Sequence, residues 1–493
     1  MKNNNIISYF LEQARRYPSV IAIQMGKEKL TYQELLQRSG VFKSYFDKQN
    51  IKENQRILIL HPLSIDLYAA MLALLAKGCT LVFVEEWAGI KDISTCQQHI
   101  KCDVMITNTK IGLVSLLYSS LRKIRKINLS VSGNTEAVHL FPVTPGKEQA
   151  AMISFSSGTS SIPKAVIRTH EILHAQFNAL KEHIPLKPGE MMCTNFPVVI
   201  LLNLGLGLST YLSSSIVFSS LEKTDFDGLY RELMEHSISC LACSPYLVHT
   251  LAKTILEKQL APLALPQIIS GGSPFFPVYA EKMYKAFPEA EIRILYGSSE
   301  AEPIAFSDGR DVLLNRNKAG LFAGAIDSNT LCKTGSIEAG VFIESEQGDP
   351  GEIIVSGDHV VKNYLNSADA LARNKIIIDG RLWHRTGDYG YFNEKRELFL
   401  TGNPAYRQGE VSLLEIEKQL SEMNGIEHAT ILYDTAYVQK EKEANEALIR
   451  KQISDKFPVA TSFKFMDLPF DKRHHGKIKY RLLVPEIKND PID

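Results

Sequence analysis

The sequence predicts an α/β protein with a large N-terminal domain and a small C-terminal domain. Short apolar runs alternate with helical patterns through the first 300 residues, which is typical of βαβ units and parallel sheets. From about residue 350, short β segments are joined by turns, and a Gly-Asn-Pro break at 402–404 precedes two helical patterns. We therefore expect one domain over residues 1–401 and a second over residues 402–493.

The first strand–helix–strand unit carries the clearest pattern. Residues 56–60 (RILIL) predict a strand, residues 64–78 an apolar helix and residues 80–85 the next strand. Similar runs predict further strands at 103–107, 214–219 and 292–296. Helices are expected at the amphipathic N-terminus (1–18), at 411–420 and near 439–453, where the charge run reads as a solvated face.

Composition excludes several classes of protein. A chain of 493 residues is too long to fold around one hydrophobic core, so more than one packed unit is expected. The 55 Lys plus Arg equal the 55 Asp plus Glu, whereas proteins that bind nucleic acid usually carry a basic excess. Seven scattered cysteines indicate a reducing cytoplasm, and the Cys240–Cys243 pair is better explained by buried thiols than by a zinc site. No signal-peptide core is found, and the apolar stretch 197–212 is too short and too interrupted to span a bilayer.

A run of small polar residues follows an apolar strand at 150–155 and precedes Lys164 and a second β-like run. Small hydroxyl residues and a glycine let backbone N–H groups approach an anion, and a lysine adds positive charge. The run suits the phosphates of ATP, although a flexible polar hairpin explains it equally well when it is taken alone. Its candidate phosphate-binding residues are Ser156, Ser157, Gly158, Thr159, Ser160 and Lys164.

Two later segments carry further candidates. In LYGSSEAEP (295–303), the Tyr296 ring could stack on a purine and the Glu300 carboxylate could hold Mg²⁺ beside phosphates. In TGDYGYF (386–392), Asp388 is expected in a tight turn after a strand, where it could accept hydrogen bonds from ribose hydroxyls or only cap the turn.

The C-terminal segment LPFDKRHHGKIKYRLL (468–483) places Lys477 after a glycine. A mobile lysine could neutralise charge that develops on a phosphate and an attacking carboxylate, while a basic tail patch is the simpler alternative. We expect His474 and His475 to be surface residues. The apolar segment 196–212 would suit the wall of an acyl pocket, if such a pocket exists.

Taken in order, SSGTSSIPK, YGSSE, RTGD and the C-terminal GK closely resemble the adenylate-forming (AMP-binding) superfamily, which includes acyl-CoA synthetases, peptide-synthetase adenylation domains and luciferases. The resemblance covers essentially the whole chain, from residue 31 to Lys477. It implies a large N-terminal domain of α/β sheets with a distorted β-barrel subdomain, and a small mobile α+β C-terminal domain.

The resemblance also implies roles for single residues. Lys477 and Glu300 would be catalytic, and Thr159 and Glu300 would hold Mg²⁺. Loop 156–164 would cradle pyrophosphate, Tyr296 would contact adenine and Asp388 would bind ribose. The remaining members of the implied nucleotide site are Gly271, Gly272, Gly297, Ser299 and Asn403.

A narrower likeness points to one branch of the superfamily. FPVVILLNLGLGL, YGSSEAEP, LWHRTGDYGYFNEKRELFLTG and PFDKRHHGKIKYRLL resemble the β-lactone synthetases of bacterial long-chain olefin biosynthesis and related fatty-acid ligases. That branch implies a fatty or 3-hydroxy fatty acid as substrate. CoA, an acyl carrier protein or the substrate's own hydroxyl would be the acceptor, and a homodimer is the candidate assembly.

The chain departs from the family pattern at several positions. Ser160-Ser161 replaces a usual Thr-Gly, and Ala165 replaces a glycine. Asn403 replaces an arginine that supports the nucleotide, and the hinge Asp or Lys is absent near Pro404. Because the segment that helps to form the pantetheine tunnel in CoA ligases is also shortened, thioester formation is in question. A degenerate nucleotide- or acyl-binding protein is therefore the alternative to an enzyme.

Overall fold

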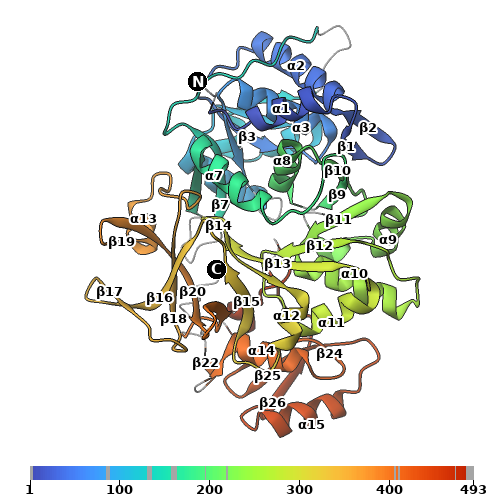
Figure 1. The fold of residues 1–493 in the computed structure, drawn as a ribbon, viewed down its shortest axis with the longest axis vertical. Coiled ribbons are helices and arrows are strands. Elements are labelled where there is room, and N and C mark those ends of the chain that lie inside the picture. Colours follow the sequence, from blue (N-terminus) through green and yellow to red (C-terminus); the bar gives the residue numbers. More distant parts are fainter. Residues whose placement is uncertain are drawn as a thin grey trace.

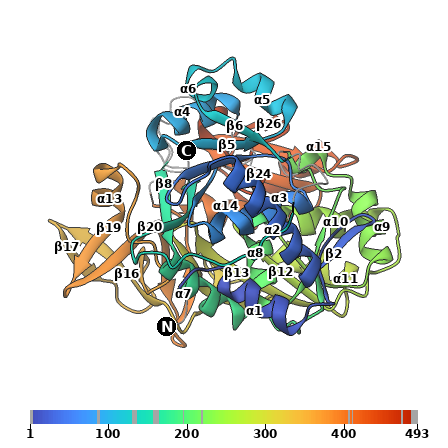
Figure 2. The ribbon, with the colours of Figure 1, turned by 90° about the horizontal axis from the view of Figure 1, so that it is seen from above.

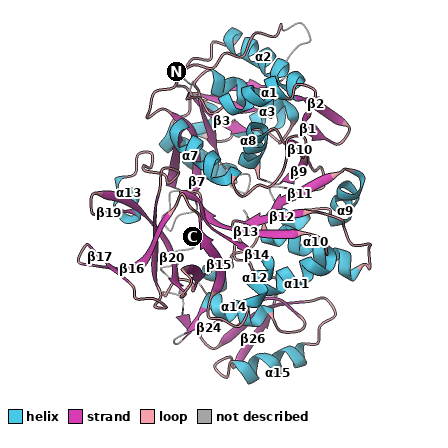
Figure 3. Ribbon diagram, in the orientation of Figure 1, coloured by secondary structure: helices cyan, strands magenta, loops and turns pink. Residues whose placement is uncertain are grey.

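The computed structural model describes residues 4–84, 89–129, 136–156, 164–194, 196–217, 220–404, 407–408, 411–471 and 474–484. It is a mixed α/β structure with helices on both faces of large sheets (Figure 3). The N-terminal sheet lies at one end of the long axis and the C-terminal elements lie at the other (Figure 1). No described helix is long and apolar enough to cross a membrane.

A six-stranded sheet forms the N-terminal part, with strand order β6-β5-β3-β4-β7-β8. Its pairs are parallel except for the β7–β8 hairpin. The predicted unit at 56–85 is confirmed as β3, α3 and β4, although β4 ends at Phe83 and residue 85 lies outside the described residues, and the strand at 103–107 is confirmed as β5. The strands are β3 (Arg56–Leu60), β4 (Thr80–Phe83), β5 (Val104–Thr107), β6 (Arg125–Asn128), β7 (Ala150–Ser156) and β8 (Lys164–Thr169).

Apolar residues explain how this sheet is covered. Helix α3 is buried along almost its whole length, which matches its uniformly apolar sequence, and Ser64 caps its N-terminus. The helices of this part are α1 (Ser8–Arg16), α2 (Tyr32–Lys48), α3 (Ile65–Ala76), α4 (Ile90–Ile100), α5 (Thr109–Ser115), α6 (Ser119–Arg122) and α7 (His170–Lys181).

A second sheet of 15 strands forms most of the molecule. Its middle is a parallel run, β10-β9-β11-β12-β13, and its distal half is antiparallel. Its strands are β1 (Ile21–Met25), β2 (Glu28–Thr31), β9 (Met191–Thr194), β10 (Ser209–Leu212), β11 (Ile238–Cys243), β12 (Gln267–Gly271), β13 (Glu291–Ser298), β14 (Ala301–Asp308), β15 (Leu321–Ile326), β16 (Leu331–Glu338), β17 (Val341–Glu344), β18 (Gly351–Ser356), β19 (Lys375–Ile378), β20 (Arg381–Phe392) and β21 (Glu397–Leu400).

The antiparallel half corrects one detail of the expected fold. Its strands continue the large sheet and do not close into a barrel within the described residues. The helices beside the large sheet are α8 (Pro197–Leu206), α9 (Phe226–Glu235), α10 (Pro245–Glu257), α11 (Pro277–Ala286), α12 (Gly309–Leu314) and α13 (Ala368–Asn374), with a short 3₁₀ turn at Leu221–Lys223.

All seven cysteines are buried and free, as expected of structural thiols.

The strand predicted at 214–219 is wrong over its described residues, 214–217. The extended segment lies earlier, as β10, and ends at Leu212. Ser213 and Ser214 donate their hydroxyls to the carboxylate of Glu232, so the chain leaves the sheet before the apolar run that suggested a strand.

The C-terminal part has an apolar cluster of its own, which includes Ile416, Ile431, Val438 and Ile453. The helix predicted at 411–420 begins at Leu413 because Ser412 is its N-cap. The run near 439–453 divides into the end of β25 and a helix that starts after Asn445. The elements are β22 (Arg407–Gln408), β23 (Val411–Ser412), α14 (Leu413–Ser421), β24 (Ile426–Leu432), β25 (Thr435–Lys440), α15 (Glu446–Lys456), β26 (Ser462–Phe465) and α16 (Tyr480–Leu483).

Candidate active site

Glu300 lies in the tight connection between antiparallel strands β13 and β14, and its residue is only 6% exposed. The Tyr364 hydroxyl donates a hydrogen bond to its Oε1 at 3.3 Å, and the Val361 N–H donates to its main-chain oxygen at 2.8 Å. A segment more than 60 residues later therefore fixes this carboxylate.

Two lysines lie in the electrostatic field of Glu300. Burial lowers the pKa of Lys164, and Glu300 opposes that shift. Burial lowers the pKa of Lys375 to about 8, again against the attraction of Glu300. Lys164 donates to Asn374 Oδ1 at 3.1 Å, whereas Lys375 donates to the Val361 carbonyl. Lys375 lines a cavity of about 200 Å³, and the other cations of that lining are Lys362 and Arg381.

The predicted phosphate loop connects two paired strand ends. Ser156 at the end of β7 pairs with Lys164 at the start of β8, so the two β runs predicted on either side of the loop are confirmed. Four of the predicted cradle residues (Ser157, Gly158, Thr159 and Ser160) lie outside the described residues. Ala165, where the family has glycine, is an ordinary residue of β8 that faces Phe155.

Arg168 ties this hairpin to the Glu300 connection. Its Nη1 donates to Ser154 Oγ at 2.7 Å, and its Nη2 donates to the Ser299 carbonyl, also at 2.7 Å. The residue is buried, and a buried guanidinium needs such partners. Sequence reasoning missed Arg168; the available signal was one arginine inside the otherwise apolar run AVIRT.

Tyr296 and Asp388, the two residues predicted to contact adenine and ribose, lie in contact with each other. The Tyr296 hydroxyl donates to Asp388 Oδ2 at 2.8 Å. Burial raises the pKa of Tyr296 well above its usual value, and the Asp388 charge adds to the rise, so the phenol keeps its proton. Gly297 follows in β13, where a Cβ atom would lie 3.0 Å from the Ala301 carbonyl oxygen.

The tight turn expected at Asp388 is wrong. Asp388 lies inside β20, where the pairing with β18 shifts register between Glu352 and Ile354. Gly387 has φ +75° at this irregularity, and the Thr386 hydroxyl accepts from the Asp388 N–H at 3.1 Å. A β-bulge therefore aims the carboxylate, a common use of bulges beside functional sites.

Gly271 and Gly272 end strand β12 at a crowded position. A Cβ on Gly271 would lie 2.6 Å from the Leu295 carbonyl oxygen, and Gly272 has φ +92°. A Cβ on Gly272 would lie 2.7 Å from the His474 ring, so the loop that carries Lys477 packs directly on this glycine pair. His474 also contacts the Phe196 ring edge-on, with centroids 5.9 Å apart.

The expectation that both histidines are surface residues is wrong, because both are half-buried. His475 packs against Tyr246, with ring centroids 4.3 Å apart, and lies 3.8 Å from Glu222. Burial lowers the pKa of His475, while Glu222 opposes the shift. The two histidine rings therefore join the C-terminal loop to Gly272, to Phe196 before α8 and to helix α10.

Asp471 organises the loop that presents Lys477. Its Oδ1 accepts from the N–H groups of Gly476 at 2.9 Å and Lys477 at 2.7 Å, and its Oδ2 accepts from the His474 N–H at 2.8 Å. Burial disfavours the charged carboxylate, but these N–H donors and the His474 charge together lower its pKa. The Lys477 side chain itself is exposed.

The predicted residues thus gather in three groups. Tyr296 pairs with Asp388, Lys164 lies near Glu300, and the Lys477 loop packs on Gly272. Strands β12 and β13 are neighbours: Gly272 directly follows β12, and β13 carries Tyr296 and leads into the connection that holds Glu300. No contact among the described residues joins the Lys477 side chain to Glu300 or Asp388. Asn403 lies just beyond β21 and is half-buried.

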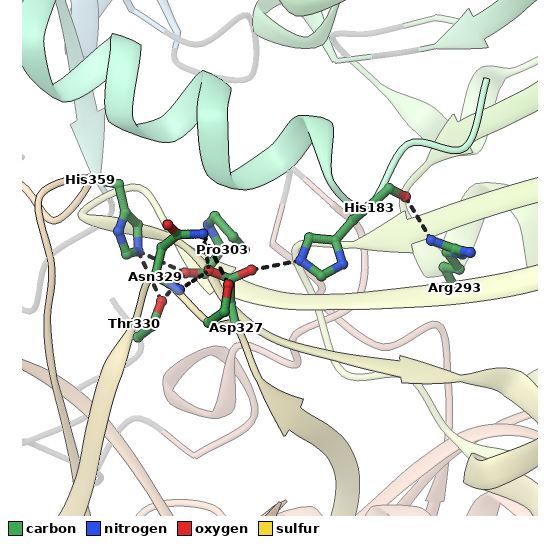
Figure 4. A network of polar contacts seen from close by, with 8 residues as sticks. His183, Arg293, Pro303, Asp327, Asn329, Thr330 and His359 are labelled. Carbon is green, nitrogen blue, oxygen red and sulfur yellow. Dashed lines mark hydrogen bonds and ion pairs between the residues drawn. The ribbon is translucent and has the colours of Figure 1, made fainter. Parts of the chain in front are cut away.

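A separate polar network holds β14 in place (Figure 4). His183 Nε2 lies 2.6 Å from Oδ2 of the fully buried Asp327 side chain, and the His183 ring stacks on Phe306. On the other side, the Thr330 hydroxyl donates to the Pro303 carbonyl oxygen at 3.0 Å, and His359 Nε2 lies 2.9 Å from the same oxygen. This network braces the strand that follows Glu300.

Comparisons with known proteins agree with this geometry. A family model described as AMP-binding enzyme matches residues 10–365. The chain is 22% identical to an olefin beta-lactone synthetase from Stenotrophomonas maltophilia (strain K279a), over 96% of each protein. It is 28% identical to 4-coumarate–CoA ligase 3 of Arabidopsis thaliana, over 52% of this chain and 45% of that protein. The matched part therefore spans about half the length of this coumarate ligase.

Solved structures share the fold. ATP-bound MatB from Rhodopseudomonas palustris superposes with a TM-score of 0.80 at 17% identity, covering 99% of each chain. The O-succinylbenzoate coenzyme A synthetase of Bacillus subtilis in complex with AMP gives a TM-score of 0.79 at 16% identity, over 98% of each chain. The predicted fold class and the predicted superfamily are confirmed, and the chain belongs to the AMP-binding enzyme family.

Proposed function

We propose that this protein activates a carboxylic acid with ATP, forms an enzyme-bound acyl-adenylate and releases pyrophosphate. Membership of the AMP-binding family supports acid adenylation. The observation that carries the proposal is the loop of Lys477, which the partly buried Asp471 carboxylate orders and which packs on Gly272, next to strand β13. A cytoplasmic location remains part of this proposal.

The reaction would be an in-line displacement at the α-phosphorus. One oxygen of the bound carboxylate forms a bond to phosphorus while the bond to the bridging oxygen of the β-phosphate breaks, and pyrophosphate leaves with that electron pair. Lys477 would neutralise charge on the carboxylate and α-phosphate, and Lys164 would face the leaving group. Such catalysis consists mainly of positioning and charge stabilisation.

Mg²⁺ fits this site if the protein and the ATP phosphates bind it together. The described residues contain no cluster of three acidic, histidine or cysteine side chains that could enclose a metal. One buried carboxylate, Glu300, together with phosphate oxygens and water is the usual environment of Mg²⁺ in nucleotide sites. A bound Mg²⁺ would neutralise charge on the phosphates, and Thr159, outside the described residues, is the second proposed ligand.

Acid-dependent ATP–pyrophosphate exchange tests the proposal. Lys477→Ala should abolish the exchange and leave the unfolding temperature unchanged, because the side chain is exposed. Lys451→Ala, an exposed lysine on α15, is the matched control and should retain full exchange. Wild-type ATP binding without exchange, over a panel of fatty, 3-hydroxy, aryl and amino acids, would instead support the degenerate binding protein.

The acceptor is a further part of the proposal. Fatty and 3-hydroxy fatty acids are the proposed substrates, and CoA or a carrier-protein thiol is the proposed acceptor in a ligase. The match to the olefin beta-lactone synthetase over 96% of both chains favours a second candidate, in which the substrate's own hydroxyl attacks the adenylate. Incubation with 3-hydroxy acids, with and without CoA, separates these: a neutral lactone formed without CoA supports cyclisation, and a CoA-dependent thioester contradicts it.

A further inference from the structure

The segment from α5 to β6 has a charge pattern unlike the rest of the chain. The whole protein carries 55 basic and 55 acidic residues, yet no Asp or Glu occurs from residue 104 to residue 135, where five Lys or Arg occur. Three of these cations are exposed and form no ion pair with a described carboxylate: Lys110, Arg122 and Lys123. The other two are engaged locally, since Arg125 donates to Gln49 and Lys126 to the Leu121 carbonyl.

Four large aliphatic side chains are exposed in the same segment, between Lys110 and Arg122 in the sequence. Leu113, Val114, Leu116 and Leu117 expose 63%, 43%, 45% and 82% of their surface, and they fill four of the five positions from 113 to 117. They lie on α5 and on the turn that leads into α6. Exposed apolar residues are ordinary when they are scattered, but a contiguous group of this kind marks an interaction surface.

The segment beneath these residues is well anchored. Ser115 and Leu121 are fully buried, and Leu121 belongs to the apolar cluster beneath α4 and β5. The turn is hydrogen-bonded, with the Leu116 and Leu117 N–H groups donating to the carbonyls of Leu113 and Val114. The aliphatic side chains therefore point outward from a folded support. Figure 2 shows α4, α5 and α6 together at one extremity of the molecule, beyond β5 and β6.

We propose that this surface, made by Lys110, Leu113, Val114, Leu116, Leu117, Arg122 and Lys123, binds the anionic face of a phospholipid bilayer. Aliphatic side chains bury themselves at the boundary between headgroups and acyl chains, while flanking cations are attracted to anionic lipids. The composition favours a bilayer over a protein partner. Protein interfaces are depleted of lysine, whereas two of the three exposed cations here are lysines, and leucine on the apolar face with Lys or Arg on the polar face is typical of segments that lie on a membrane.

Sedimentation with large unilamellar vesicles tests the proposal. The wild-type protein should bind vesicles that contain about 30% phosphatidylglycerol at least about tenfold more tightly than pure phosphatidylcholine vesicles. Raising the salt from about 0.1 M to about 1 M should remove most of that preference, because the Debye length falls from about 10 to about 3 Å. Wild-type protein that stays in the supernatant with anionic vesicles would overturn the proposal.

Two sets of variants separate the contributions of the surface. Lys110→Gln, Arg122→Gln and Lys123→Gln together should weaken binding to anionic vesicles about 100-fold, at about fivefold for each cation. Leu113→Ser with Leu117→Ser should weaken binding to both kinds of vesicle. The controls are Leu314→Ser, an 81% exposed leucine on α12, and Lys451→Gln on α15, and both should bind like wild type.

Folding of each variant is checked by its circular dichroism and by its ATP–pyrophosphate exchange without vesicles. If the surface variants bind anionic vesicles as well as wild type does, the proposal is wrong. The same holds if they lose affinity only for an acidic carrier protein, because the surface would then be a protein-docking site.

Discussion

Asp471→Asn tests whether a single carboxylate holds the Lys477 loop in its working position. Three N–H groups, of His474, Gly476 and Lys477, converge on the two Asp471 oxygens at 2.7–2.9 Å. Asparagine keeps only one oxygen acceptor, and its amide nitrogen would face an N–H group on the other side. At least one bond is therefore lost, and the rest lose the assistance of the charge.

The size of the effect follows from those bonds. A hydrogen bond to a charged group contributes about 1.5–3 kcal/mol, and an unmet buried donor costs a similar amount. We expect the ordered loop to lose about 3 kcal/mol relative to a disordered loop. Since about 1.4 kcal/mol is a factor of ten, the catalytic constant for exchange should fall about 100-fold.

ATP–pyrophosphate exchange and thermal unfolding, measured on the same samples, provide the assay. Exchange should fall in Asp471→Asn, while global unfolding changes little because the loop is only a small part of the core. Asp455→Asn, an exposed carboxylate on α15, is the matched control. An exchange rate within about twofold of wild type in Asp471→Asn would refute the reasoning, provided that Lys477→Ala is inactive.

The pH dependence of Asp471 has a definite sign. Its folded pKa is lowered, so the stabilisation of the loop is complete above the unfolded value of about 3.9 and is lost as pH falls through the lower folded value. Titration of Asp471 should therefore leave exchange unaffected at neutral and alkaline pH. Any loss of activity near neutral pH must have another source.

Three further predictions concern other buried groups. Burial raises the pKa of Glu417 to about 7, so the free energy of unfolding should fall as pH rises from about 4 through about 7. Glu417→Gln should remove this pH dependence and raise the free energy of unfolding by about 3 kcal/mol at pH 8, as measured by urea unfolding. Arg168→Met should lose about 2–4 kcal/mol in the same assay and at least about tenfold in kcat/KM for ATP, and Arg168→Lys should recover only part of either loss. Tyr296→Phe removes the bond to Asp388 and should raise KM for ATP about tenfold with little change in kcat; an unchanged KM would exclude this pair from ribose binding.

Local patterns in the sequence predicted the fold well because strands and helices leave a periodic signature. The unit from Arg56 to Phe83 has uniformly apolar segments of the right lengths, and the structure follows them closely. The strand expected at 214–219 is wrong because two serine hydroxyls bond Glu232, and hydrophobicity does not record such bonds.

The site was only partly predictable for the same reason. Motifs indicated Tyr296, Glu300, Asp388 and Lys477, but not how they are held. Arg168 reaches a carbonyl 131 residues later, and Tyr364 reaches a carboxylate 64 residues earlier. Patterns within short windows contain no information about such pairings, and a β-bulge that aims Asp388 leaves no periodic trace. The role of Asp471 was hidden because its partners are backbone N–H groups.

The contacts between the C-terminal part and the large sheet bear on the proposed boundary at residue 402. They include the partly exposed ion pair Lys282–Glu441 at 3.5 Å and the more buried pair Lys253–Glu427 at 3.1 Å. An exposed pair contributes only about 0–1 kcal/mol and is screened by salt, so exchanging Lys282–Glu441 for water is inexpensive. This pattern supports the proposal that residues 402–493 form a unit that can change its position.

Lys418 on α14 differs from these pairs. Its side chain is only 3% exposed, and its ammonium donates to the main-chain carbonyls of Lys318 and Gly320. Moving α14 away would leave a charged group in need of new partners, which is costly when the group is buried. Lys418 therefore opposes any separation close to the proposed boundary, whereas the Lys282–Glu441 pair is easily exchanged. A rotation of residues 402–493, as proposed, would have to hydrate the Lys418 ammonium and also lift the His474 ring from Gly272, so these two contacts set its free-energy cost.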